Sequence, residues 1–167
     1  KGIILLYFMM EKLNDLIDKL YENDVSIYVV GGFIRTSVYN KVHGTNMPIK
    51  DIDFVVSGIK ENKLMEILKI YGKVKHVGLA FGVIIFKPNN SDEVFEIALP
   101  RKEISTGCEY KSFDIEIDPF LPIEKELGRR DFTINAMCVK INCVDAIDNI
   151  ASPDFFDLDK VIAPFGG

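Results

Sequence analysis

Apolar residues at helical spacing predict two amphipathic helices, in residues 10–23 and 60–71. In both segments apolar side chains recur at i, i+3 and i+4, so that they line one face of a helix. Gly72 ends the second helix. The inward positions are Leu13, Leu16, Ile17 and Leu20 in the first helix and Leu64, Ile67 and Leu68 in the second. Each segment therefore predicts a helix that packs one face against other elements.

Short apolar runs that end at glycines or at a turn predict buried strands. Residues 27–30 stop at two glycines, and residues 51–58 form a second such strand. Residues 77–99 predict a hairpin, in which VGLAFGVIIFK and EVFEIAL flank the turn PNNSD. Residues 33–40 predict a helix that begins directly at the two glycines.

The second half of the chain contains fewer apolar anchors. RKEISTGCEYKSF, residues 101–113, is polar and predicts a mobile loop. Residues 123–141 predict a helix start followed by a strand, and residues 151–167 an irregular segment. Alternating helices and strands with one hairpin indicate an α/β (α+β) fold, in which helices flank a mixed β-sheet.

The composition of the 167-residue chain fits one folded domain with a substantial core. Hydrophobic residues make up 48% and charged residues 27%, which argues against general disorder. The net charge of −5 argues against binding nucleic acid by bulk charge alone, but it leaves room for a local basic pocket.

The cysteines, the histidines and the apolar N-terminal run indicate which cellular compartment and which kinds of metal site to expect. Three cysteines without a CxxC pair, and two histidines, make a zinc site unexpected, and free thiols indicate a cytoplasmic protein. The apolar run 2–10 is shorter than the roughly 20 residues that span a bilayer, and no signal-peptide cleavage site follows it. We therefore expect no membrane partner, and we expect residues 1–24 to hold an N-terminal extension and a helix.

Two glycines lie where the first strand passes into a helix. Gly31 and Gly32 place backbone N–H groups at a helix N-terminus, where they can hold a phosphate, and Arg35 lies on the first turn of that helix. Because Gly-Gly turns are common, a purely structural turn remains the alternative.

Acidic residues lie on two of the predicted strands. Asp51 and Asp53 are two positions apart and point to the same face, so they either hold Mg²⁺ or are solvated at a strand end. Glu96 shares its face with Val94 and Ala98. If its strand pairs beside the strand of Asp53, Glu96 supplies a third carboxylate; otherwise it lies on the exposed face of a hairpin.

Arginines and polar residues are concentrated in GRRDFTINAM, residues 128–137. Arg130 suits a phosphate through its planar fork of donors. If the segment is helical, Asp131 and Asn135 lie on one face and can bind a sugar hydroxyl; an exposed capping cluster is the alternative. A phosphate-binding turn, carboxylates and arginines together are what phosphoryl or nucleotidyl transfer requires, because that chemistry depends on positioning and on neutralising developing charge.

Four segments, VVGGFIR, KDIDFVV, EIALPRKE and GRRDFTINAM, in this order and spacing, resemble the head domain of class II tRNA nucleotidyltransferases. This family contains CCA-adding enzymes and bacterial poly(A) polymerases, within the DNA polymerase β-like superfamily. RRDFTINAM is the most specific part of the resemblance, which covers residues 27–167. It implies a nucleotidyltransferase head over residues 25–150, with residues 151–167 as the start of a connection to a neck domain.

The resemblance also implies roles for individual residues. Asp51 and Asp53 correspond to the catalytic Mg²⁺ ligands, and Glu96 to a catalytic acid on a neighbouring strand. The positions implied to bind the nucleotide are Gly31, Gly32, Arg35, Arg101, Arg130, Asp131 and Asn135. The implied reaction transfers CMP or AMP from CTP or ATP to the 3′ end of tRNA and releases pyrophosphate, with contacts to the body of the RNA expected from further C-terminal domains.

The sequence departs from the family pattern at several points. Thr36 stands where the family has an acid after the arginine, Ala163 stands where it has Asp before Pro-Phe-Gly-Gly, and the loop 41–49 is longer than usual. The EDxxR motif that selects the base in the neck domain does not occur. A poly(A) polymerase head, a nucleotide-binding domain without turnover and a folded fragment without activity therefore remain as alternatives.

Overall fold

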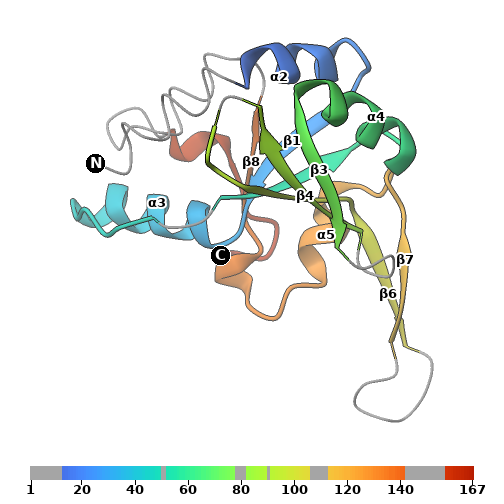
Figure 1. The fold of residues 1–167 in the computed structure, drawn as a ribbon. Helices are drawn as coiled ribbons and strands as arrows, with labels where there is room; N and C mark the ends of the chain where they lie inside the picture. Colours follow the sequence, from blue (N-terminus) through green and yellow to red (C-terminus); the bar gives the residue numbers. More distant parts are fainter. Residues whose placement is uncertain (1–12, 50–51, 78–81, 90, 106–112, 142–156) are drawn as a thin grey trace.

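The computed structural model shows helices on both sides of a central sheet, with a narrow two-stranded arm that projects from it (Figure 1). The described residues are 13–49, 52–77, 82–89, 91–105, 113–141 and 157–167. The helices are α2 (Asn14–Tyr21), α3 (Gly32–His43), α4 (Glu61–Tyr71) and α5 (Ile123–Gly128), with 3₁₀ turns η1 (Thr133–Asn135) and η2 (Leu158–Lys160). The strands are β1 (Ser26–Val30), β2 (Asp53–Ser57), β3 (Gly72–Val77), β4 (Val83–Pro88), β5 (Phe95–Ala98), β6 (Arg101–Ser105), β7 (Phe113–Ile117), β8 (Cys138–Ile141) and β9 (Val161–Ile162).

The main sheet is mixed and largely antiparallel. Its strand order is β3-β4-β5-β2-β1-β8-β9, while β6 and β7 pair with each other in the projecting arm. Strands β2 and β5 run parallel, and their register sets Asp53 directly beside Glu96. On the other side of β2, Asp53 pairs with Val30 of β1. Residues in register share a face of the sheet, so Glu96, Asp53 and Val30 form one row across three strands.

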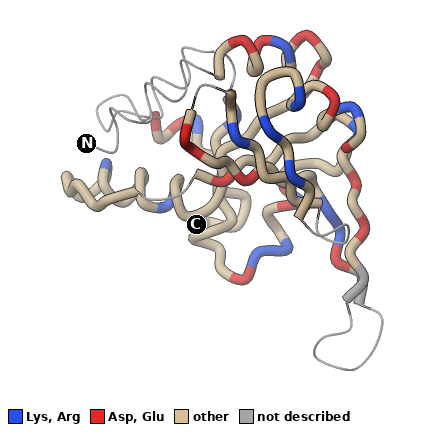
Figure 2. The backbone as a smooth tube through the Cα atoms, in the orientation of Figure 1, with Lys and Arg blue, Asp and Glu red and all other residues tan. Residues whose placement is uncertain are grey.

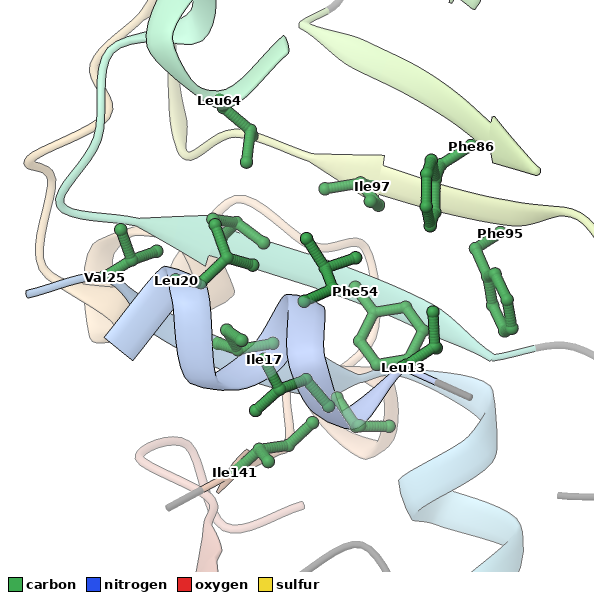
Figure 3. Packing of buried hydrophobic residues seen from close by; sticks show 14 of the residues in the cluster. Leu13, Ile17, Leu20, Val25, Phe54, Leu64, Phe86, Phe95, Ile97 and Ile141 are labelled. Carbon is green, nitrogen blue, oxygen red and sulfur yellow. The ribbon is translucent and has the colours of Figure 1, made fainter. Parts of the chain in front are cut away.

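One face of the sheet packs against α2 and α4, and the contacts form the larger hydrophobic core (Figure 3). The apolar stripe of each helix points into this core, which is why both segments fold as amphipathic helices. Phe54 and Phe95 from the sheet meet in an edge-to-face ring contact within the core. Each fully buried aliphatic side chain stabilises the fold by about 1.5–3 kcal/mol relative to an exposed one.

The opposite face of the sheet is divided between a covered part and an open part. Over β1, β2 and β8, the side chains of α5 cover a second, smaller core that includes Val30, Val55 and Cys138. Toward the β3 edge, Glu96 and Lys75 are exposed. Asp53, also exposed, therefore lies where the covered part of this face gives way to the open part.

Most of the predicted elements are confirmed in the residues that the structure describes. The helices predicted over 60–71 and 33–40 are α4 and α3, and α2 is the described part of the helix predicted over 10–23. The hairpin is formed by β4 and β5, and β5 pairs beside β2 as the interpretation of Glu96 required.

Several sequence-based expectations were wrong. Strand β3 follows α4 directly and was not predicted, and α3 continues to His43, into the segment predicted as loop. Residues 101–105 form β6 where a loop was expected over 101–113, and β7 begins at the last residue of that predicted loop. Residues 106–112 lie outside the described part. The irregular C-terminal segment contributes η2 and β9.

Two further expectations concern the extent of the domain and the membrane. The limits at residues 24/25 and 150/151 stay predictions, and residues 150 and 151 themselves lie outside the described ranges. In the described part of the chain, no helix is long and apolar enough to cross a bilayer.

Candidate active site

The glycine turn between β1 and α3 presents bare backbone to two charged side chains. Gly31 has φ 71° and ψ −131°, a conformation that glycine adopts readily and side-chain-bearing residues rarely do. A Cβ atom built on Gly31 would stand 3.0 Å from Nη1 of Arg130 and 3.9 Å from Oδ2 of Asp53. The turn, the guanidinium and the carboxylate therefore converge on one point at the N-terminus of α3.

Arg35 bends back over the start of its own helix. Its Nη2 lies 3.7 Å from the position of a Cβ on Gly32, and its Nη1 donates a 2.6 Å hydrogen bond to Oδ1 of Asn135. The backbone supports this arrangement, because the N–H of Gly31 donates to the carbonyl of Met137, two residues beyond Asn135. Two motifs that are 100 positions apart in the sequence thus form one surface.

The carboxylates of Asp53 and Glu96 lie on adjacent strands at the same face of the sheet. They are in register across the parallel β2–β5 pair, where strands are about 4.8 Å apart, and both residues are exposed. Two exposed carboxylates at this spacing are suitable oxygen ligands for a hard divalent cation that also binds a phosphate. Asp51 lies outside the described residues, so its part in such a site stays a prediction.

Arg130 is the cation that lies near Asp53 at the glycine turn. Its side chain is 20% exposed, and its Nε is buried without a hydrogen-bond partner among the described residues. Burial lowers the pKa of the Arg130 guanidinium, whereas the nearby carboxylates of Glu126 and Asp53 favour its charged form. The terminal nitrogen Nη1 of Arg130 lies beside the glycine turn and can donate to an anion that enters the site.

Residues 130–137 do not form the helix on which the pairing of Asp131 and Asn135 depended. Phe132 is extended, with φ −129° and ψ 137°, and only a single 3₁₀ turn follows before β8 begins. Asp131 and Asn135 therefore do not share a helix face: Asn135 reaches Arg35, while Asp131 is exposed. The roles predicted for both residues at the sugar remain predictions.

Arg101 lies in a cluster of arginines and glutamates beside α5. Its backbone N–H donates to Oε2 of Glu126 at 3.1 Å, and its Nη2 is 3.9 Å from Oε1 of Glu103. Burial, followed by the charge of Arg129, lowers the pKa of the Arg101 guanidinium. Neither Glu126 nor Arg129 was predicted from the sequence as a site residue, although their i, i+3 spacing is a signal for a side-chain pair on a helix.

Comparison with known proteins agrees with the nucleotidyltransferase fold that these elements form. The model of the poly A polymerase head domain family matches residues 27–158. A CCA-adding enzyme of Buchnera aphidicola is 36% identical over 113 residues, which are 68% of this chain and 24% of the relative. A multifunctional CCA protein of Haemophilus ducreyi is 33% identical over 143 residues, which are 86% of this chain and 27% of the relative.

Solved structures give the same result. A CCA-adding enzyme in an apo form aligns with a TM-score of 0.56 and 27% identity, over 99% of this chain and 32% of the other. A tRNA nucleotidyltransferase complexed with a primer tRNA and an incoming ATP analogue aligns with a TM-score of 0.55 and 27% identity, over 90% of this chain and 34% of the other.

The fold and the polar surface at the glycine turn define the class of nucleotidyltransferase head domains. The chain belongs to the poly A polymerase head domain family, and relatives that it matches are CCA-adding enzymes. It spans about a quarter of the length of the two relatives named above.

Proposed function

We propose that this chain is the catalytic head of a tRNA nucleotidyltransferase that adds CMP and AMP, from CTP and ATP, to the 3′ end of tRNA. The observation that carries the proposal is the convergence of Arg130, Asp53 and the backbone of Gly31 on one point. The similarity to CCA-adding enzymes supports this reaction over poly(A) synthesis.

The triphosphate is held at the start of α3 in this proposal. The N–H groups of the Gly31-Gly32 turn and the helix dipole favour an anion there, and Arg35 and Arg130 supply charged donors on either side. Arg35 is fixed by its bond to Asn135, so its guanidinium needs little reorganisation when the phosphate arrives. Asn135, with Asp131 and Arg101, completes the proposed nucleotide contacts.

The transfer step joins the RNA to the α-phosphate. The 3′-hydroxyl oxygen of the RNA forms a bond to the α-phosphorus, the bond from that phosphorus to the bridging oxygen breaks, and pyrophosphate leaves. In this proposal one of the two aspartates, Asp51 or Asp53, would assist removal of the hydroxyl proton, and Arg130 would balance the charge on the leaving group. Asp51, Asp53 and Glu96 would hold Mg²⁺, which when bound neutralises triphosphate charge.

The open part of the sheet offers a surface for the RNA backbone. Lys75 lies in the same transverse row as Ile85 and Glu96, and Lys73 pairs with Lys87 two positions further along the strands. Figure 2 marks the lysines and arginines of the described residues in blue along the backbone. Because Lys73 and Lys75 are exposed, they can contact phosphates of a strand whose end lies at Glu96.

The remaining parts of the proposal concern surroundings and partners. We expect contacts to the body of the tRNA to come from other parts of a longer protein, because the chain covers 24% of the Buchnera relative. The sequence has three cysteines and no CxxC pair, and Cys138 is a free thiol in the described part, which supports the cytoplasm as the compartment.

The test is transfer of labelled nucleotide to a tRNA that lacks its terminal CCA. The chain is incubated with this tRNA, Mg²⁺ and labelled CTP and ATP, and the RNA products are resolved at single-nucleotide length. Addition of two C residues and one A supports the proposal. A long run of A would indicate a poly(A) polymerase, and binding of ATP and CTP without any product would indicate a binding domain.

A further inference from the structure

Glu126 is a completely buried carboxylate surrounded by arginines. Its side chain is 0% exposed, on the short helix α5. Oε2 accepts hydrogen bonds from Nε of Arg129 at 2.8 Å and from the backbone N–H of Arg101 at 3.1 Å. Oε1 contacts Nη2 of Arg129 and lies 3.9 Å from Nη2 of Arg130. One carboxylate thus connects α5, the start of β6 and the arginine that faces the glycine turn.

The burial of this carboxylate requires an explanation other than stability alone. Removing an ionised carboxylate from water costs free energy unless the group is paired with a cation and hydrogen-bonded. Even a paired buried ion contributes little net stability to the fold. Here the fork of Arg129 satisfies both carboxylate oxygens, which is the strong bidentate arrangement. Burial acts to lower the pKa of the Arg129 guanidinium, but the hydrogen bonds and charges of Glu126 and Glu103 outweigh it and raise this pKa overall.

The two neighbouring arginines have different surroundings. Arg129 is turned toward Glu126 and toward Glu103 of β6, whose Oε1 lies 3.4 Å from its Nη1. Arg130 touches Glu126 with one terminal nitrogen only, while its other terminal nitrogen lies at the glycine turn. The positive charges of Arg129 and Arg130 repel each other, and Glu126 pairs with both side chains. Without the negative charge of Glu126, the guanidinium groups of Arg129 and Arg130 would repel each other. Arg130 would also lose its ion pair with Glu126.

We propose that Glu126 is a positioning residue of the nucleotide site, which holds Arg130 against the Gly31 turn without touching the substrate itself. This inference rests on the proposed function, because it assigns to Arg130 the phosphates of a nucleoside triphosphate. Arg129 is then the partner that donates to both carboxylate oxygens of Glu126, and Arg130 is the donor left for the ligand.

The test compares three variants of the chain. Glu126→Gln keeps the size of the side chain and removes its charge. Glu126→Asp keeps the charge but shortens the side chain by one methylene group, which moves the carboxylate away from the arginines. Glu124→Gln is the matched control, because it removes the same charge from the same helix, α5, at an exposed position. The dissociation constant for ATP with Mg²⁺ is measured by calorimetry at a temperature where thermal unfolding shows each variant folded, and the ¹⁵N Nε–H resonance of Arg130 is recorded without nucleotide.

Glu126→Gln is expected to weaken ATP binding about tenfold and to shift the Arg130 resonance. Glu126→Asp is expected to weaken binding by about threefold, and Glu124→Gln to change neither the affinity nor the resonance. Unchanged affinity in folded Glu126→Gln would overturn the inference. If Glu126→Gln does not fold, Glu126→Asp replaces it in the test, and unchanged ATP affinity in Glu126→Asp would then overturn the inference. If the unchanged chain binds no ATP, the proposed function fails, and an Arg130 resonance that the substitution leaves in place would separately overturn the positioning role.

Discussion

Nη1 of Arg35 donates a 2.6 Å hydrogen bond to Oδ1 of Asn135, across 100 positions of the sequence. The bond connects the first turn of α3 with the 3₁₀ turn η1, and both lie beside the backbone of Gly31. Two polar motifs, each of which alone has an ordinary structural explanation, are therefore parts of one surface.

Replacing Arg35 with Gln is expected to weaken ATP binding by about tenfold or more. The variant loses both the charged donor at the start of α3 and the charge-assisted bond to Asn135, and such bonds contribute about 1.5–3 kcal/mol. Calorimetric titration with ATP measures the change. Lys19→Gln, on α2 at the opposite face of the sheet, removes the same charge and is expected to leave affinity unchanged. Equal effects of the two substitutions would contradict the assignment of Arg35.

Gly31→Ala is expected to reduce both stability and nucleotide binding. The positive φ costs about 1–3 kcal/mol for a residue with a Cβ, and the new methyl group displaces Nη1 of Arg130. Gly44→Ala is the control at the other end of α3, because Gly44 has φ 59° with nothing within 4 Å of a Cβ. We expect Gly44→Ala to lower the thermal midpoint while ATP affinity stays the same. Loss of affinity in both variants would indicate a general effect of helix strain.

Lys73→Gln with Lys75→Gln is expected to weaken RNA binding without changing ATP binding. Each phosphate contact with a single strand contributes about 0.7 to the slope of log affinity against log salt, so the slope is expected to fall by about 1.4. The pair Lys63→Gln with Lys69→Gln, on α4 at the other face, is the matched control. Fluorescence anisotropy with a short labelled RNA at several salt concentrations checks this, and identical slopes in the two double variants would refute an RNA path over β3.

Cys138 is expected to make the protein less stable at alkaline pH. Burial raises the pKa of this thiol to about 12, above its value of roughly 8.5 in an unfolded chain. Between these pH values the folded state keeps a proton that the unfolded state releases, so the free energy of unfolding falls by about 1.4 kcal/mol for each pH unit. Measuring the free energy of unfolding in urea from pH 8 to 10.5, for the unchanged chain and for Cys138→Ala, isolates this contribution. Parallel pH profiles for the two proteins would contradict it.

Elements that bury a continuous apolar surface could be predicted from the sequence. Elements that bury only part of their side chains could not be predicted. Strands β1 and β2 are almost entirely buried, and their apolar runs are unambiguous. Strand β3 is an edge strand in which Val74 packs inward while Lys73 and Lys75 face solvent, so its signal is weak.

The candidate site was predicted only as far as local motifs allow. Gly31, Arg35, Asp53 and Arg130 were identified from strand and turn patterns, and their proximity depends on the register of the sheet and on α5. Glu126 was not identified, because a glutamate three and four residues before arginines has the spacing of an exposed ion pair on a helix. Its burial is a consequence of the packing of α5 on the sheet, which no local pattern contains.

The most direct test of the account is the Mg²⁺ dependence of ATP binding by the unchanged chain and by Asp53→Asn. Asp53 and Glu96 lie side by side next to the turn that is proposed to hold the triphosphate, so a divalent cation should link the carboxylates to the nucleotide. Asp92→Asn, at an exposed position that pairs with Lys87, controls for the loss of a carboxylate. We expect Mg²⁺ to strengthen ATP binding in the unchanged chain and in Asp92→Asn, and to have little effect in folded Asp53→Asn. An undiminished effect of Mg²⁺ in Asp53→Asn would contradict the account.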